Sequence, residues 1–481
     1  MKTFYKLMTM AALSLSSVVS FAQLKGKTAV ELRDMMGAGW NVGNSLDAFG
    51  KPGMEAETSW GNPKVSECIV DKAYQAGFRT LRVPVSWGGH ISSQNGYQSY
   101  IDRQWLGRVK EVVDYGYNRG MFVILNIHHD NGADNTNTCF FPTNAQKDKS
   151  VKYVTEIWTQ LADYFADYDQ HLIFETLNEP RLVGDMNEWW FYPVDYPQQS
   201  QIREAISVIN DMNQAGVNAI RNGKGNNNDR MILVPGYAAC PDGVCTSLFQ
   251  VPNDPTPNRI GLEVHAYRPT ELCLTGDRKT FQDSDRQTII NEVFAPLSQK
   301  YGNTNIPIII DETSIADKGQ GTQERLKWIN CYYSLAKEYK MPCVLWDNGT
   351  TWQTYQLGLT QGWSDPNVNG ECHGFMNRNS CQWTDPTLIS RIIEIIGVPV
   401  TTVLNVVAND VKVYSANGML YVSAENVIDR VRVIDMNGHV LLDKIAESNS
   451  VEYSVSNINP GVYAVYVETQ GGNKAEMVVV K

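Results

Sequence analysis

The sequence has little positive charge. Its 481 residues include 41 Lys and Arg against 52 Asp and Glu, which gives a formal net charge of −11 at neutral pH. Nothing in this balance indicates a polyanionic partner, so we expect no binding to nucleic acid. The sequence also lacks internal repeats and low-complexity runs, as is typical of a globular protein.

Long apolar runs are lacking beyond the N-terminus. The one such run, residues 7–21, follows the basic start Met1–Lys6, and small residues at Ser20 and Ala22 come before Gln23. The run is too short to span a bilayer and has the pattern of a secretory signal peptide. We expect residues 1–22 to be removed and the mature chain to be secreted or held at the cell surface.

The cysteine count is odd. Export makes the nine cysteines candidates for disulfides, and an odd number leaves at least one without a partner in the chain. Cys240 with Cys245, and Cys372 with Cys381, are spaced so that each pair could close a loop, although spacing does not determine pairing. Three others lie in apolar segments and are predicted to be buried thiols: Cys68, Cys331 and Cys343.

Eight short apolar runs recur with helix-like segments between them. They cover residues 38–44, 78–85, 122–129, 171–180, 231–235, 260–267, 306–313 and 343–348. Such nearly continuous hydrophobic runs are typical of parallel strands buried on both faces, in a (β/α)8 barrel or a doubly wound sheet. The count of eight, and the lack of a Gly-x-Gly-x-x-Gly turn after the first run, favour an α/β fold of the (β/α)8 TIM barrel type over residues 23–399.

The composition changes near Val398. Residues 400–481 contain seven short strand-like runs separated by turn signals such as Asn417-Gly418 and Pro460-Gly461, with no convincing helix. This pattern predicts a small C-terminal β-sandwich.

Two of the barrel runs end in a carboxylate. The run from His171 stops at Asn178, Glu179 and Pro180, and the run from Ile306 reaches Asp311 and Glu312. Ligands of parallel α/β proteins bind at such strand ends, and two converging acids suit cleavage of a glycosidic bond. Alternation along a strand would let only one of Asp311 and Glu312 face the barrel interior.

Glu175 and Glu179 are an even number of residues apart, so their side chains point to the same face of the predicted strand. Because Glu175 lies four residues earlier in the strand, we expect it to be a buried, paired acid and not a catalyst. Arg82 could form such an ion pair with it, or could hold a nucleophile ionised. The pair His128-His129 is not expected to bind a metal, because neighbouring strand residues point apart and no third ligand has suitable spacing.

These motifs resemble glycoside hydrolase family 5, and within it the subfamily 4 endoglucanases. The resemblance covers about residues 30–397 and rests on eight segments: 39–48, 57–63, 82–85, 126–129, 174–181, 264–267, 311–312 and 345–346. It implies a retaining (β/α)8 barrel that acts on β-1,4-glucans without a metal or organic cofactor. The family usually has glycine before the nucleophile, where this chain has Asp311.

The resemblance also implies a role for each matching residue. Glu179 is expected to be the acid/base and Glu312 the nucleophile, with Arg82 and Tyr267 orienting and ionising Glu312. Asn178 would bind the sugar 2-hydroxyl. The remaining candidates for substrate binding are Asn44, His128, His129, His265 and the aromatic floor Trp346.

Four tryptophans follow barrel strands and could either stack on sugars or pack loops: Trp60, Trp189, Trp190 and Trp352. The loop 181–196 is the expected wall of the substrate groove. The expected activity is a secreted, monomeric endo-β-1,4-glucanase that cleaves by double displacement, with xyloglucan, mixed-linkage glucan and glucomannan as further substrates. An endo-mannanase, a xyloglucan-specific enzyme or a non-catalytic polysaccharide-binding protein stays an alternative.

The C-terminal segment resembles the sorting domain of Bacteroidetes proteins that pass through type IX secretion. The matching segments are 434–442, 458–467 and 474–481. The resemblance implies the outer-membrane secretion machinery as a partner. A carbohydrate-binding sandwich is the alternative, but residues 400–481 contain no Trp.

Overall fold

The computed structural model describes residues 24–132, 139–189, 200–274, 278–353, 372–399, 411–435, 440–469 and 472–480. The predicted signal peptide, Trp190 and residues 191–196 of the predicted groove wall lie outside these ranges. The chain divides into two compact units, one comprising Leu24–Thr401 and the other containing Thr402–Lys481.

Eight parallel strands form the centre of the larger unit. They are β1 (Gly39–Asn41), β2 (Thr80–Val83), β5 (Phe122–Asn126), β6 (Leu172–Glu175), β7 (Ile232–Val234), β8 (Ile260–His265), β9 (Ile308–Thr313) and β10 (Cys343–Leu345). They close into a barrel in the order β1-β10-β9-β8-β7-β6-β5-β2. Each of the eight predicted runs contains one of these strands, so the predicted barrel is confirmed.

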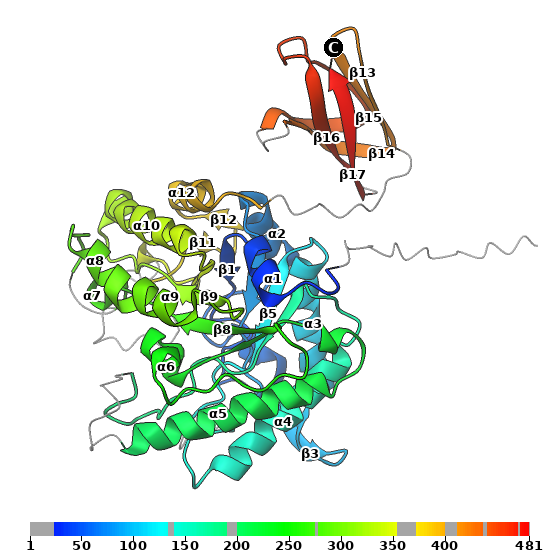
Figure 1. The fold of residues 1–481 in the computed structure, drawn as a ribbon. Coiled ribbons are helices and arrows are strands. Elements are labelled where there is room, and N and C mark those ends of the chain that lie inside the picture. Colours follow the sequence, from blue (N-terminus) through cyan, green and yellow to red (C-terminus); the bar gives the residue numbers. More distant parts are fainter. Residues whose placement is uncertain are drawn as a thin grey trace, which may run out of the picture. The chain divides into compact units, whose positions relative to one another are not determined.

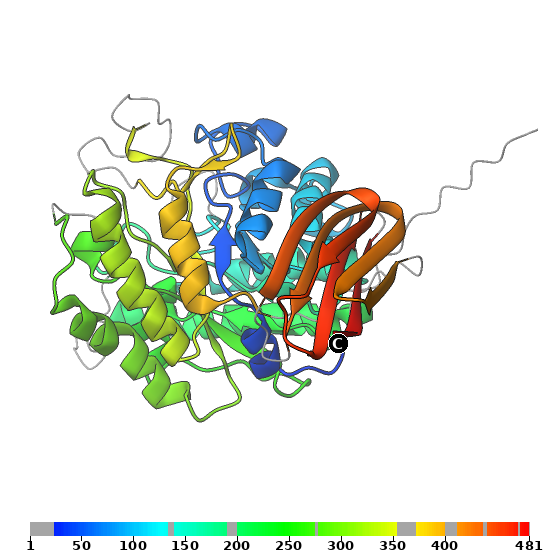
Figure 2. The ribbon, with the colours of Figure 1, turned by 90° about the horizontal axis from the view of Figure 1, so that it is seen from above.

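Helices surround the barrel (Figures 1 and 2). They are α1 (Ala29–Met35), α2 (Glu67–Ala76), α3 (Arg103–Tyr117), α4 (Lys147–Tyr164), α5 (Ser200–Arg221), α6 (Pro241–Cys245), α7 (Thr270–Cys273), α8 (Asp285–Ile289), α9 (Ala295–Tyr301), α10 (Gly321–Glu338) and α12 (Pro386–Ile396). In α4 the buried residues Val154, Ile157 and Leu161 recur at steps of three and four, which places them on one face of the helix. That face packs into the main apolar core.

Polar residues line the barrel interior at the carboxyl ends of the strands. The register places Asn41 of β1 beside Arg82 of β2, and Asn126 of β5 beside Glu175 of β6. All four side chains are completely buried. Because buried polar groups need partners, this register sets up the hydrogen-bond network of the site.

Strand β9 contains one extra residue between two successive pairings with each of its neighbours. The pairings show it on both sides: Glu263 pairs with Ile309 and His265 with Glu312, while Cys343 pairs with Ile310 and Leu345 with Thr313. Such an extra residue is a β-bulge, at which alternation fails. Asp311 and Glu312 therefore both face the interior, 3.7 Å and 2.6 Å from Arg82. The prediction that one of them faces the helix layer is wrong.

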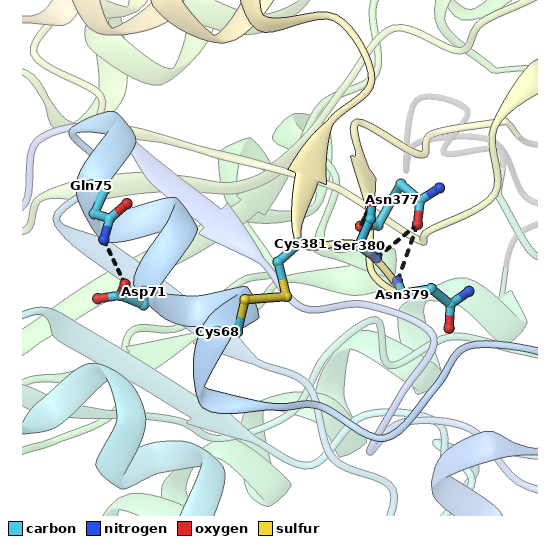
Figure 3. The surroundings of a disulfide bond; sticks show 7 residues. All are labelled: Cys68, Asp71, Gln75, Asn377, Asn379, Ser380 and Cys381. Carbon is cyan, nitrogen blue, oxygen red and sulfur yellow. Dashed lines mark hydrogen bonds between the residues drawn. A yellow bond between two sulfur atoms is a disulfide. The ribbon is translucent and has the colours of Figure 1, made fainter.

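A disulfide joins Cys68 of α2 to Cys381, in the turn of the hairpin formed by β11 (Met376–Asn377) and β12 (Gln382–Trp383) (Figure 3). The predictions of a buried thiol at Cys68 and of a Cys372–Cys381 pair are wrong, because the fold brings together residues 313 positions apart.

The other suggested pair, Cys240 with Cys245, is not bonded in the described part of the chain. Two further cysteines were predicted to be buried thiols. Cys343 is buried, as predicted, whereas Cys331 is half-buried.

The C-terminal unit is a separate sheet domain with its own apolar core. Its strands are β13 (Lys412–Ala416), β14 (Met419–Ile434), β15 (Val440–Ser454), β16 (Gly461–Thr469) and β17 (Gly472–Val480). Within the described residues these five strands replace the seven predicted runs, because β14 and β15 each continue through two of them. The first part of β14 pairs with β13 and the last part with β16, and register shifts between Ser423 and Arg430 separate the two parts.

Among the described residues, no helix is both long enough and apolar enough to cross a membrane.

Replacing both Cys68 and Cys381 with Ala should lower the free energy of unfolding by about 2–5 kcal/mol, because the cross-link closes a very long loop and restricts the unfolded chain. Urea unfolding of the purified protein would measure the change. Cys331→Ala, at a half-buried thiol outside the cross-link, is the matched control and should change stability far less. Equal stability of the double variant and the parent would show that the cross-link contributes nothing.

Candidate active site

The guanidinium of Arg82 is the centre of the site. Its Nε and Nη2 donate to the two carboxylate oxygens of Glu175, each at 2.6 Å. Nη2 also donates to Asn178 at 2.7 Å, and Nη1 donates to Asn41 at 3.1 Å and to Glu312 at 2.6 Å. All five N–H groups of Arg82 are therefore in use. Glu175 is the buried, paired acid that the sequence predicts, and Arg82 contacts both it and Glu312.

Three further groups surround the carboxylate of Glu312, near the end of β9. The hydroxyl of Tyr267 donates to Oε2 at 2.9 Å, and His265 Nδ1 lies 3.4 Å from the same oxygen. His128 Nε2 lies 4.0 Å from Oε1. Burial raises the pKa of Glu312, while the positive charges of His265 and Arg82 act in the opposite direction. The contacts with Arg82 and Tyr267 both favour the ionised form.

Glu179 contacts the same ring nitrogen of His265 that lies near Glu312. His265 Nδ1 is 2.7 Å from Glu179 Oε1, and Arg181 is 3.5 Å from Oε2. One carboxylate oxygen of Glu179, one of Glu312 and one ring nitrogen of His265 lie within 4.8 Å of one another. The two acids predicted from the strand ends therefore meet at one place.

His265 and Glu179 share a proton. Burial lowers the pKa of His265, but Glu312 and Glu179 outweigh it and raise that pKa to about 9. Burial acts to raise the pKa of Glu179, but the hydrogen bond from His265 lowers it to about 2. In the free enzyme the proton is thus on the imidazole, one short hydrogen bond from the carboxylate that could receive it.

The other predicted substrate-binding residues form the rim. Trp346 lies parallel to His128, with ring centroids 6.0 Å apart, and a Cβ on Gly43 would be only 2.5 Å from the Trp346 ring. Glycine at that position therefore permits the close approach of strand end and ring.

Asn44 follows β1 with a positive φ of 54°. Hydrogen bonds between its backbone and the side chains of Asp47 and Asn62 hold it in this conformation. Among the hydrogen bonds of the described residues, none joins its side chain to the two acids. Its predicted role in substrate binding therefore stays a prediction.

His128 and His129 do not point apart. Strand β5 ends at Asn126, so alternation no longer applies, and the two rings pack edge to face with centroids 4.3 Å apart. One ligand atom of each, with one of Asp47, lies within 4.8 Å of the others. The geometric reason given for expecting no metal there is therefore wrong. However, His128 Nδ1 contacts Asn126 at 3.0 Å and Asp47 accepts backbone N–H bonds, so these groups already have protein partners.

The predicted tryptophans differ in exposure. Trp60 is half-buried, with its ring centroid 5.4 Å from that of His129. Trp189 is 54% exposed, and the guanidinium of Arg181 lies over its ring at 3.9 Å. Trp352 is half-buried, and its indole lies against Gly319. Trp60 thus contacts His129 and Trp189 contacts Arg181. Stacking on sugars and packing of loops both stay predictions for these two tryptophans.

Comparisons with known proteins identify the family of the chain. Residues 46–351 match the family described as cellulase, glycosyl hydrolase family 5. The chain belongs to that family. Residues 415–481 match the secretion system C-terminal sorting domain.

Relatives of this family 5 glycoside hydrolase match about three quarters of its chain. It is 34% identical over 376 residues to Endoglucanase A of Ruminococcus albus, covering 77% of this chain and 94% of that protein. A broad specificity endoglucanase from Ruminococcus champanellensis with bound cellotriose superposes with a TM-score of 0.67 at 36% identity, covering 76% and 98%. A lichenase from Caldicellulosiruptor sp. F32, with cellotetraose, gives a TM-score of 0.68 at 33% identity, covering 79% and 98%.

Sequence reasoning missed some members of the site. Glu263 lies on β8 two residues before His265. Alternation along the strand would therefore have placed its side chain on the same face as that of His265, inside the barrel. Asn41 and Asn126 lie within motifs that the sequence singled out, but their contacts with Arg82 and Glu175 depend on the strand register.

The pH dependence of the family 5 enzyme should report the shared proton. We expect kcat/KM to fall as pH rises through about 9, because the pair formed by His265 and Glu179 then loses its proton. In His265→Ala, Glu179 must hold the proton alone. The pH at which kcat/KM falls on the alkaline side should then be at least about one pH unit lower than in the parent. His171→Ala, at the opposite end of β6, is the control and should keep the parent's pH dependence. The same pH dependence in His265→Ala and the parent would contradict a shared proton.

Proposed function

We propose that the enzyme is a retaining endo-β-1,4-glucanase in which Glu312 is the nucleophile and Glu179 the acid/base. The observation that carries this proposal is that one carboxyl oxygen of Glu179 lies within 4.8 Å of one of Glu312. Retaining enzymes need carboxyls about 5–5.5 Å apart, whereas inverting enzymes leave a wider gap for a water molecule. The different surroundings of the two acids support the division of roles.

In the first step Glu312 attacks the anomeric carbon of the sugar. Arg82 and Tyr267 hold its carboxylate ionised and oriented. As the glycosidic C–O bond breaks, the proton shared by His265 and Glu179 passes from Glu179 to the leaving oxygen. The products are a glycosyl ester on Glu312 and a released chain end, so atoms and charge balance.

In the second step water breaks the ester. Glu179, now without its proton, takes one from the water, whose oxygen bonds to the anomeric carbon while Glu312 leaves as a carboxylate. His265 stays within hydrogen-bond distance of Glu179 and returns the pair to its starting state. One protonated pair and one ionised nucleophile are therefore enough for the full cycle.

The surrounding residues suit the binding of a sugar ring. Asn178, whose side-chain oxygen accepts a hydrogen bond from Arg82, would bind the 2-hydroxyl beside the anomeric carbon. Trp346 supplies a flat apolar surface, and His128, His129 and Asn44 supply polar groups along the rim. Stacking on an aromatic ring together with hydrogen bonds from fixed polar groups is the usual way in which such sites orient a ligand.

The substrate that we propose is a soluble β-1,4-linked glucan, cut at internal bonds. The named relatives, an endoglucanase, a broad specificity endoglucanase and a lichenase, all support a glucan backbone. The C-terminal sorting domain supports delivery to the cell surface or beyond, with the secretion machinery as the partner. We further propose removal of residues 1–22 as a signal peptide and a monomeric enzyme.

Trapping with a 2-fluoro cellobioside that carries an activated leaving group should attach the sugar to Glu312, because the fluorine slows both steps and the leaving group restores the rate of only the first. Peptide mass analysis after digestion would locate the label. Glu179→Ala should still be labelled when the inactivator carries an activated leaving group, since that group needs no acid. A label on Asp311 would overturn the assignment of the nucleophile. Faster labelling by the matching mannobioside would favour the mannanase alternative.

A further inference from the structure

Two buried acids take no part in the steps above. Glu263 of β8 and Asp311 of β9 are both completely buried inside the barrel. None of their four carboxyl oxygens has a hydrogen-bond partner among the residues that the structure describes. An ionised carboxylate in such a place would lose its hydration without compensation, at a high cost.

Arg82 cannot supply the missing donor. Its Nε is 3.7 Å from Asp311 Oδ2, which is ion-pair distance but too long for a hydrogen bond. All five of its N–H groups already donate, two of them to Glu175. A guanidinium has no sixth donor, and His265 Nε2, at 3.6 Å from Asp311 Oδ1, is also too far for a hydrogen bond, so each acid must bring its own hydrogen.

Other charged groups face the two acids from the surrounding strands. His265 Nε2 is 3.6 Å from Asp311 Oδ1 and 3.4 Å from Arg82 Nη2. The titratable or charged neighbours, from β2, β6, β8, β9 and the loops after β5 and β6, are Arg82, Glu175, His265, Glu312, His128 and Glu179. Five acids thus meet two histidines, Arg82 and, beside Glu179, Arg181, and burial lowers the pKa of His128 so that it stays neutral. Full ionisation of the acids is therefore disfavoured.

Glu175 is the acceptor that remains. Its carboxylate takes two bonds from Arg82 and one from Asn126 at 2.7 Å, which leaves about one of its roughly four acceptor positions open. Burial and the neighbouring Glu175 raise the pKa of Glu263 and of Asp311 well above the usual range. Burial acts to raise the pKa of Glu175 too, but Arg82 outweighs it and lowers that pKa. The charge therefore belongs on Glu175 and the protons on the other two.

We propose that Glu263 and Asp311 are positioning residues that hold protons in the working enzyme and that their two O–H groups share the open acceptor position of Glu175. The three residues form an acid cluster that presents a single negative charge to Arg82. This proposal rests on the proposed function, because its purpose is to leave Nη1 of Arg82 for the nucleophile Glu312. An ionised Asp311, 3.7 Å from Nε of Arg82, would instead compete with Glu175 for the guanidinium and disturb its orientation toward Glu312.

Infrared difference spectroscopy tests the protonation directly. We expect the C=O stretch of a protonated carboxylic acid in the parent at pH 7, reduced in Glu263→Gln and in Asp311→Asn. Asp443→Asn is the matched control: it removes an acid whose pKa is lowered by Arg430, so it should not reduce this band. The spectrum is recorded without substrate. Its result on protonation would therefore remain valid even if the glucanase assay failed.

Activity then tests the positioning role. The amides keep a neutral donor toward Glu175, so their kcat/KM should stay within about tenfold of the parent. Glu263→Ala and Asp311→Ala lose the donor and should fall roughly 10- to 100-fold, with circular dichroism to confirm folding.

Two results would overturn the proposal. One is an unchanged acid band in both amide variants, which would mean that the two acids are ionised in the parent. The other is a stoichiometric metal in elemental analysis of the purified protein, since Glu263, His265 and Asp311 each offer one atom within 4.8 Å of the others. The positive charge of Arg82, 3.4 Å from His265, disfavours such a metal.

Discussion

The site depends on one buried cation. Arg82 is completely buried, and its compensation comes from the acids and amides that its five N–H groups reach. Glu175 balances its charge on one edge, which frees the other edge for Glu312. A charge buried without such partners would cost several kcal/mol. The position and orientation of Glu312 and of the neighbouring Asn178 therefore follow from the placement of a single guanidinium.

The bulge in β9 decides how many acids surround that cation. With regular alternation only one of Asp311 and Glu312 would enter the barrel, and the proposed acid cluster could not form. Because both enter, the interior holds more carboxyls than it has positive charges to match. Protonation is the simplest way to balance this excess, and hydrogen bonds between carboxyls then give the added O–H groups an acceptor.

Much of the fold could be predicted from the sequence, because buried parallel strands give nearly continuous apolar runs. Glu179 and Glu312 could be found because each ends such a run. Features that depend on pairing between strands were not visible: the bulge that turns Asp311 inward is one, and the bond between Cys68 and Cys381 is another. Each joins segments whose contact the local pattern does not encode. Glu263 was missed, although it lies two residues from His265 and alternation along a strand places two such side chains on the same face.

The central claim is that Glu179 and Glu312 are close enough for a double displacement. Its most direct test is the anomeric configuration of the first product, followed by proton NMR during hydrolysis of a soluble cello-oligosaccharide. Two successive inversions predict that the β-anomer appears first and the α-anomer only later, through mutarotation. Initial release of the α-anomer would mean that water attacks directly, and would contradict the account.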